Sequence, residues 1–234
     1  MAHRREVGPV PSLVGGALDA ALVGIGALLA ARGLDDAPIE ETLVAASRAG
    51  MDDGDLRVLS LVLTWLSAHS ERVNADHLFR LVAAEPSARV RALWSAVGSW
   101  LGKDRRLARL RALWTGPPVD LLAVGGEFQI RRRGEDLRFA KSALRVPAHT
   151  LRDRPGDVLS PTELAARHRG YRARVIMGPS YRADMWALLE SKHGLSAAEL
   201  ARRSGGSYAT GWEIRRDWEL VRQASQRATS MGAS

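Results

Sequence analysis

The sequence predicts a mainly α protein with an N-terminal helical bundle, a short β-hairpin in the middle and a C-terminal domain of three helices. Residues 12–114 repeat apolar helical patterns that are separated by Gly, Pro and Asp-Gly pairs. Residues 127–141 alternate apolar and polar side chains around a glycine, which is typical of a hairpin. Residues 195–221 contain two short helical patterns joined by glycines. The chain therefore divides into residues 1–118, a linker at 119–157, and residues 158–234.

The N-terminal bundle is expected to mediate protein interaction or dimerisation, because short helices with brief connectors pack as an antiparallel bundle or a small solenoid. Asp35 and Asp36 precede Pro38, and the acidic residues at 52–55 precede another apolar run, as expected where helices begin. The six predicted helices lie near residues 12–31, 37–49, 53–69, 74–84, 87–101 and 104–114.

The first thirty residues have some features of a secretory signal, because a basic stretch at 3–5 is followed by an apolar run at 20–31. Asp19 stands before this run, and Gly24 and Gly26 interrupt it. A stretch of about 12 apolar residues is also too short to span a bilayer. We therefore expect a buried first helix, no membrane partner and a cytoplasmic protein.

Positive charge is concentrated in the second half of the chain. The formal net charge of +8 divides into +1 for residues 1–118 and +7 for residues 119–234, and almost all of the cations are arginines. Arginine forms bidentate hydrogen bonds with phosphate and with guanine, which suits a nucleic-acid partner. Genomic base composition would explain the excess of Arg over Lys, but it would not explain the difference between the halves. There is no cysteine, which excludes disulfides and thiolate zinc sites.

The middle of the chain is expected to form the hairpin, with strands at 128–131 and 137–140. Gly116-Pro117-Pro118 ends the preceding helix, because proline cannot continue one. Three consecutive arginines would then stand at the end of the first strand. They would either contact a DNA phosphate or simply be solvated. These residues are Arg131, Arg132 and Arg133.

Residues 195–221 carry clear helix boundaries. Ser196 and Glu199 have the spacing of a capping box, so a helix should begin at Ala197. It should end at residues 204–206, where two glycines tolerate the left-handed conformation of a C-cap. Ser207 can cap the next helix.

The second of these helices has two unlike faces. A core-facing stripe at helical spacing contains Ser207, Gly211, Ile214, Trp218 and Val221. The opposite face combines two large aromatic residues with arginines, which is unusual for a solvated surface unless a partner covers it. The residues of that face are Tyr208, Ala209, Trp212, Arg215, Arg216 and Glu219.

An earlier segment repeats the start of this region. Residues 159–167 match residues 195–203 at six of nine positions, and both segments carry the same Ser-to-Glu cap. Nine residues are equally consistent with an old duplication and with two unrelated helices that share a favourable start.

The stretch resembles the helix-turn-helix of bacterial DNA-binding regulators in residues 199–203, the Gly205 turn and residues 207–210. The resemblance implies that the second helix enters the major groove with its N-terminal residues at the base edges. Ser204 and Gly206 stand where an apolar residue is commoner, and Gly211 where a branched aliphatic is commoner, so we expect weaker packing between the two helices.

A wider segment, residues 172–221, is similar to the winged-helix-like domains of regulators found in phage-defence and toxin-antitoxin operons. Residues 181–193 would form its supporting first helix. A wing would follow the recognition helix, but residues 223–234 are short and polar and are expected to fray as a tail. A wing would then have to come from the hairpin near 127–141.

The sequence thus predicts a transcriptional regulator that binds double-stranded DNA as a homodimer, with a partner protein on the N-terminal helices. The residues expected at base edges are Ser207, Tyr208, Trp212, Arg215 and Arg216. The residues expected at phosphates are Arg202, Arg203, Arg182, Arg131, Arg132 and Arg133. The alternative is an antitoxin-type or assembly subunit whose aromatic and arginine side chains dock on a protein, because the same residue types form interface hot spots.

No catalytic, metal or cofactor site is expected. The six histidines lack the paired spacing of a metal site on one helix. Gly125-Gly126 lacks the Lys and Ser or Thr of a phosphate-binding loop, and no nucleophile-elbow motif occurs. These observations favour a binding protein over an enzyme.

Overall fold

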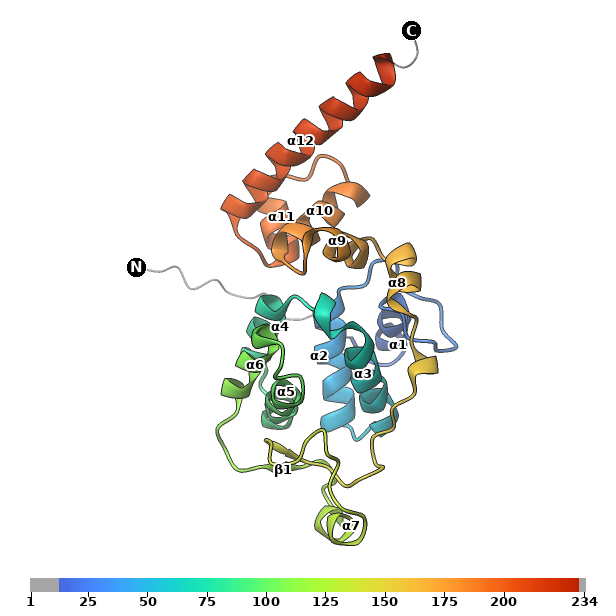
Figure 1. The fold of residues 1–234 in the computed structure, drawn as a ribbon, viewed down its shortest axis with the longest axis vertical. Coiled ribbons are helices and arrows are strands. Elements are labelled where there is room, and N and C mark those ends of the chain that lie inside the picture. Colours follow the sequence, from blue (N-terminus) through green and yellow to red (C-terminus); the bar gives the residue numbers. More distant parts are fainter. Residues whose placement is uncertain (1–12, 232–234) are drawn as a thin grey trace, which may run out of the picture. The chain divides into compact units, whose positions relative to one another are not determined.

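The computed structural model describes residues 13–231 and confirms the mainly α fold (Figure 1). These residues form twelve α-helices and one two-stranded sheet. The chain folds as two compact units, which we call the N-terminal unit (residues 1–164) and the C-terminal unit (residues 165–234). Within the described residues, no helix combines the length and the apolar character that a membrane crossing requires.

The N-terminal unit begins with six helices. Their bounds are α1 (Gly16–Gly24), α2 (Ile39–Met51), α3 (Leu56–His69), α4 (Ala75–Ala83), α5 (Ala88–Trp100) and α6 (Arg105–Ala108). Short 3-10 helices lie at η1 (Ser70–Arg72), η2 (Arg109–Leu113) and η3 (Pro155–Asp157). α2 to α5 lie close to the predicted ranges, whereas α1 is shorter and the predicted helix at 104–114 is divided between α6 and a 3-10 helix. Asp55, Asn74 and Ser87 accept hydrogen bonds from first-turn amides of α3, α4 and α5, so the starts of these helices are set by local side chains.

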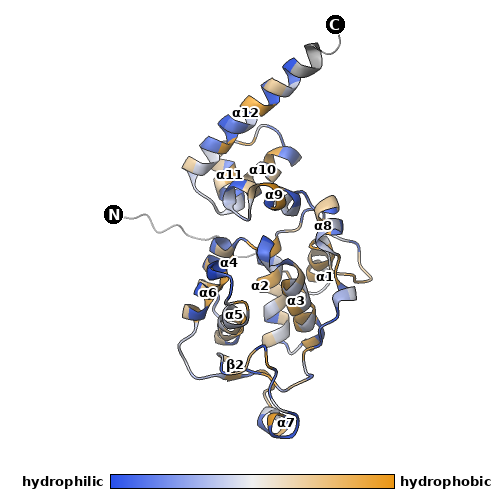
Figure 2. Ribbon diagram, viewed as in Figure 1, coloured by the Kyte–Doolittle hydropathy of each residue, from blue (hydrophilic) through white to orange (hydrophobic). Residues whose placement is uncertain are grey.

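The core of the N-terminal unit lies between α2, α3 and α5. Trp65 and Trp94 are its largest buried side chains. The indole Nε1 of Trp65 donates to the carbonyl of Ile25 at 2.8 Å, which ties α3 to the end of α1. Figure 2 shows α3 coloured mainly as apolar, as expected of a helix most of whose residues are buried in the core.

The first helix is shorter than the predicted range of 12–31, whose first residue lies outside the described part. α1 ends at Gly24, where a side chain would collide with the carbonyl of Leu34. Gly26 then takes a positive φ of 100°, and its carbonyl accepts from the amide of Leu159 at 2.8 Å. The apolar run therefore leaves the helix to pair with residues 157–159. The basic stretch at 3–5 also lies outside the described residues.

The predicted hairpin at 127–141 does not form. Residues 126–133 are instead a helix, α7 (Gly126–Arg133), which is flanked by Gly125 and Gly134, both with positive φ. Of the apolar side chains in the two predicted strands, Phe128 and Leu137 are exposed and Phe139 is buried, so the two strands would share no continuous buried face. The sheet consists of β1 (Val119–Asp120) and β2 (Leu144–Arg145), which pair in parallel.

Residues 119–157 are packed rather than extended as a linker. Their buried side chains are Leu121, Phe139, Leu144, Val146 and Leu151. The guanidinium of Arg89 on α5 donates to the carbonyls of Asp120 and Leu121 at 3.3 and 3.0 Å. This segment therefore belongs to the N-terminal unit, and α8 (Pro161–Arg167) spans the division between the units.

The C-terminal unit contains α9 (Arg169–Met177), α10 (Tyr181–Ser191), α11 (Ala197–Ser204) and α12 (Tyr208–Met231). Its apolar cluster comes from the last three helices and the turn before α11, and comprises Met185, Leu189, Leu195, Leu200 and Ile214. Arg174 and Asp184 form an ion pair of 2.7 Å that joins α9 to α10.

The predicted tail at 223–234 is wrong for its larger part, because α12 continues to Met231. Residues 219–227 are all exposed, so this half of the helix has no packed face. Its side chains are mainly of the types that favour helix without tertiary support, including Arg, Gln and Ala.

Candidate nucleic-acid interface

The boundaries of α11 follow the sequence prediction. The amide of Ser196 donates to Glu199 Oε2 at 2.9 Å, and the amide of Glu199 donates to Ser196 Oγ at 3.2 Å, which completes the capping box. The hydrogen bonds from the amide and the hydroxyl of Ser196 hold the pKa of the Glu199 carboxyl below its usual value. Gly205 follows the helix with a left-handed φ of 70°.

The turn between α11 and α12 is compact. Ser204 is buried; its hydroxyl donates to the carbonyl of Leu200 at 2.8 Å and accepts from the amide of Gly206 at 3.1 Å. A side chain at Gly206 would collide with the end of Met185, and a Cβ at Gly211 would lie 2.6 Å from the carbonyl oxygen of Ala197. These small residues permit a close approach of the helices, where the sequence analysis expected weaker packing.

The outer face of α12 is exposed at its N-terminal end. Tyr208 is 60% exposed and Trp212 is 54% exposed, whereas Ile214 on the opposite face is fully buried. Val221 is 49% exposed, so its predicted place in the core is wrong. The reason is that Val221 lies beyond the part of α12 that packs against the apolar cluster.

Ser207 lies at the start of α12 and is half-buried. Its hydroxyl accepts from the amide of Thr210 at 2.9 Å and lies 2.6 Å from the hydroxyl of the same residue. Ser207 therefore caps the helix, as expected, and its hydroxyl is already engaged there.

Two arginines flank the exposed aromatic residues. Arg215 pairs with Glu219 at 3.0 Å, and Arg216 pairs with Asp217 at 3.0 Å. The guanidinium carbon of Arg216 also lies 5.6 Å from the centre of the Trp212 ring, within the range of a cation–π contact. Both charges are therefore partly neutralised by carboxylates on the same helix.

Arg182 forms ion pairs with two carboxylates of α12. It extends from α10 to α12, where it lies 3.3 Å from Glu213 and 3.1 Å from Asp217. Hydrogen bonds from Arg216 and Arg182 hold the pKa of the Asp217 carboxyl below its usual value. The sequence analysis missed this acidic flank, although the spacing of four residues between Glu213 and Asp217 would have placed both on one side of the helix.

Arg202 and Arg203 carry the uncommitted positive charge of the motif. Both lie in the last turn of α11, both are exposed, and neither forms an ion pair with any residue that the structure describes. They are thus accessible to a phosphate, and the charge of Arg203 also acts on the Glu199 carboxylate one turn earlier and contributes to its low pKa.

The other three predicted arginines lie in the N-terminal unit. Arg131, Arg132 and Arg133 form the last turn of α7 instead of a strand end, and all three are exposed. Arg131 lies 4.0 Å from Glu127 one turn earlier. With the predicted hairpin absent, residues 127–141 do not provide a wing.

Aromatic packing supports α12 from within the C-terminal unit. The rings of Trp186 and Trp218 meet edge to face with centres 4.9 Å apart, and His193 stacks on Trp218 at 5.9 Å. Because Trp218 is fixed against α10, the outer face of α12 is held in one orientation relative to α10 and α11.

One group of side chains elsewhere has the composition of a metal site. Ligand atoms of Glu40, Glu41 and His77 lie within 4.8 Å of one another. His77 Nε2 lies 2.8 Å from Glu41 Oε1, and Glu40 Oε1 accepts from the amide of Asn74 at 2.8 Å. These bonds tie α2 to α4, which gives the group a structural role. The sequence offered no local signal for it, because its members lie far apart in the chain.

Comparison of the chain with models of protein families, with curated proteins and with solved structures found no match.

Proposed function

We propose that this chain is a sequence-specific regulator that binds double-stranded DNA through α11 and α12. The supporting observation is the outer face of α12, where Tyr208 and Trp212 are exposed beside Arg216 while the opposite face is packed. Large exposed aromatic residues among guanidinium groups are typical of a surface that a partner covers.

In this proposal the residues divide by role. Tyr208, Trp212 and Arg216 face the base edges in the major groove, where an arginine discriminates guanine by a bidentate contact. Arg202 and Arg203 bind backbone phosphates, which fix the register of the protein but carry no sequence information. A homodimer formed through the N-terminal unit would match a palindromic operator, and this remains part of the proposal.

The test begins by selecting duplexes from a random library with the full-length protein, and then measures affinity at two salt concentrations. Arg216→Gln should lose about 1–3 kcal/mol on the selected duplex and little on unrelated ones. Arg203→Gln should weaken binding to all duplexes alike and reduce the slope of log affinity against log salt by about 1.

Arg105→Gln is the matched control, because Arg105 is exposed on α6 and has no ion pair within the described residues. It should bind DNA as the unaltered protein does. The proposal is wrong if no sequence is enriched, or if Arg216→Gln and Arg203→Gln also bind like the unaltered protein.

A second candidate function is protein binding through the same face. It is favoured by the ion pairs of Arg215 and Arg216, which reduce the positive charge that a polyanion would meet. Salt separates the two candidates, because phosphate binding weakens steeply with ionic strength and an interface anchored by aromatic residues does not. Weak duplex binding with a negligible salt dependence would favour this candidate.

A further inference from the structure

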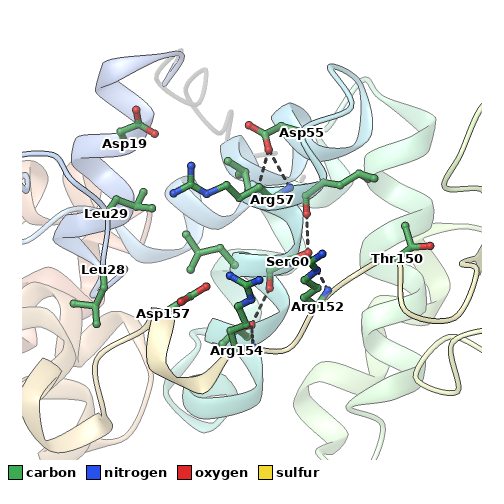
Figure 3. A pocket seen from close by; sticks show the side chains of 14 residues that line it. Asp19, Leu28, Leu29, Asp55, Arg57, Ser60, Thr150, Arg152, Arg154 and Asp157 are labelled. Atoms are coloured by element: carbon green, nitrogen blue, oxygen red, sulfur yellow. Dashed lines mark hydrogen bonds between the residues drawn. The ribbon is translucent and has the colours of Figure 1, made fainter.

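The N-terminal unit contains a pocket of about 610 Å³ that the function proposed above does not use. Figure 3 shows it between α3, the segment that follows α1, and residues 150–157. Its apolar lining includes Leu28, Leu29 and Leu61, and its charged lining includes three arginines. Small-molecule sites of this volume are common in proteins and combine an apolar wall with a few polar groups.

Hydroxyl groups of α3 hold one wall of the pocket in place. The amide of Arg152 donates to Ser60 Oγ at 3.2 Å, and the amide of Arg154 donates to Thr64 Oγ1 at 3.2 Å. Ser60 and Thr64 are one helical turn apart, so the segment follows the helix, as Figure 3 shows. Arg152 and Arg154 are thus carried by a backbone that is fixed to α3 at two points.

Three arginines line the pocket. Arg57 extends from the first turn of α3 into the space near Leu29 (Figure 3). Arg57, Arg152 and Arg154 are exposed, and none forms an ion pair with a residue in the described part of the chain. Of the carboxylates, Asp55 is engaged as the cap of α3, where it accepts from two amides. Asp19 and Asp157 also line the pocket.

We propose that this pocket binds a phosphorylated small molecule of nucleotide size. A guanidinium group can bind two phosphate oxygens at once, and three such groups stand in the lining, where Asp19, Asp55 and Asp157 balance their charge. The leucines provide an apolar wall for a flat ring. Asp19 and Asp157 would accept hydrogen bonds from the hydroxyl or amino groups of the ligand, so the lining suits a molecule that carries donors as well as phosphate.

The test is isothermal titration of the full-length protein with three probes: inorganic pyrophosphate, ATP and adenosine. ATP should bind more tightly than pyrophosphate, and adenosine should bind too weakly to measure, because the phosphates supply most of the interaction. Arg152→Gln and Arg154→Gln should each weaken ATP binding at least about tenfold, since a charge-assisted hydrogen bond contributes more than the free energy of that factor. Circular dichroism would check that both variants remain folded.

Two control variants make the result specific to the pocket. Arg105→Gln removes an exposed arginine of the same unit, and Arg203→Gln removes one from the proposed DNA interface. Both should bind ATP as the unaltered protein does, so the pocket and the DNA interface can fail independently. The proposal is overturned if neither pyrophosphate nor ATP binds, if ATP binds no better than pyrophosphate, or if either control loses as much affinity as Arg152→Gln.

Discussion

Because Gly211 has no side chain, the backbone of α12 lies close to the backbone of Ala197, the first residue of α11. A Cβ at this position would lie 2.6 Å from the carbonyl oxygen of Ala197 and 3.3 Å from its Cα. The obstacle is backbone rather than a flexible side chain, so the helix would have to move to relieve the clash. The angle between the two helices therefore depends on the absence of a single methyl group.

Gly211→Ala should consequently destabilise the C-terminal unit by about 1–3 kcal/mol, the usual cost of overpacking. The sign of this change in the free energy of unfolding is informative, because Gly→Ala inside a helix normally stabilises a protein by about 0.5–1 kcal/mol. Urea unfolding followed by circular dichroism would measure it. Gly16→Ala in α1 is the control, since a Cβ at Gly16 meets nothing within 4 Å. A stabilised Gly211→Ala variant would contradict the close approach.

The role of a single residue could be predicted where it depends only on near neighbours in the sequence. Ser196, Glu199 and Ser207 were assigned as caps from spacing alone, and the hydrogen bonds agree. The roles of Gly206 and Gly211 were not predictable, because they depend on which atoms of Met185 and Ala197 lie opposite, and sequence spacing does not give those distances.

Among the elements, α8 and α11 provide a matched pair. Both begin with the same capping box: Ser160 and Glu163 exchange hydrogen bonds just as Ser196 and Glu199 do. They differ in what they bury. α11 buries Ala197, Leu200 and Ser204, whereas the buried residue of α8 is Leu164.

Ser196→Ala should therefore lower the free energy of unfolding by about 1 kcal/mol, the typical cost of losing an N-cap. Ser160→Ala should cost less, because α8 contributes less to a core and can fray without exposing much apolar surface. Thermal unfolding of the two variants side by side gives the comparison. An equal or larger loss for Ser160→Ala would show that these caps act independently of the packing behind them.

A helix or strand could be predicted from the sequence where its apolar pattern fitted only one type of secondary structure. α2 to α5 have helical apolar spacing, α3 to α5 also have side-chain caps, and the predicted ranges of all four hold to within three residues. α7 was misassigned because a short alternating run fits a helix as well as a strand until a buried face selects between them. The last half of α12 was missed because it carries no packed stripe, and helical propensity alone extends it.

At the scale of the whole molecule, the C-terminal unit has a core of its own. Two apolar clusters of this unit, one that contains Leu200 and one that contains Ala183, are formed by residues 173–218. The first complete helix of the unit, α9, begins with a local cap, because His168 accepts from the amide of Tyr171 at 3.0 Å.

A fragment of residues 165–234 should therefore fold alone, with helical circular dichroism and cooperative urea unfolding. Its stability should be modest, on the order of 3–5 kcal/mol, because a core of this size supplies little more. The same fragment with Leu200→Asp should be unfolded, since this side chain is fully buried. A fragment that lacks cooperative unfolding without the substitution would show that the N-terminal unit is needed to stabilise it.

Features built from segments that are far apart in the chain could not be predicted from the sequence. The pocket joins α3 to residues 150–157, and the group of Glu40, Glu41 and His77 joins α2 to α4. Neither produces a local sequence pattern, because each depends on which distant segments the fold brings together. The charge of +7 on residues 119–234 pointed to the C-terminal half, but it did not separate Arg202 and Arg203 from arginines that are already paired.

The carboxylates on α12 lie on a different side of the helix from its exposed aromatic residues. Glu213 and Asp217 share one side of it, while Tyr208, Trp212 and Arg216 are spaced four residues apart along another. Arg182 pairs with both carboxylates, so this side of the helix carries little net charge, whereas Arg202 and Arg203 on α11 form no ion pair in the described part of the chain. If the unit binds DNA as we propose, these two cations would turn the whole unit toward the polyanion during the encounter, before any short-range contact forms, which leaves a smaller angular search to complete docking.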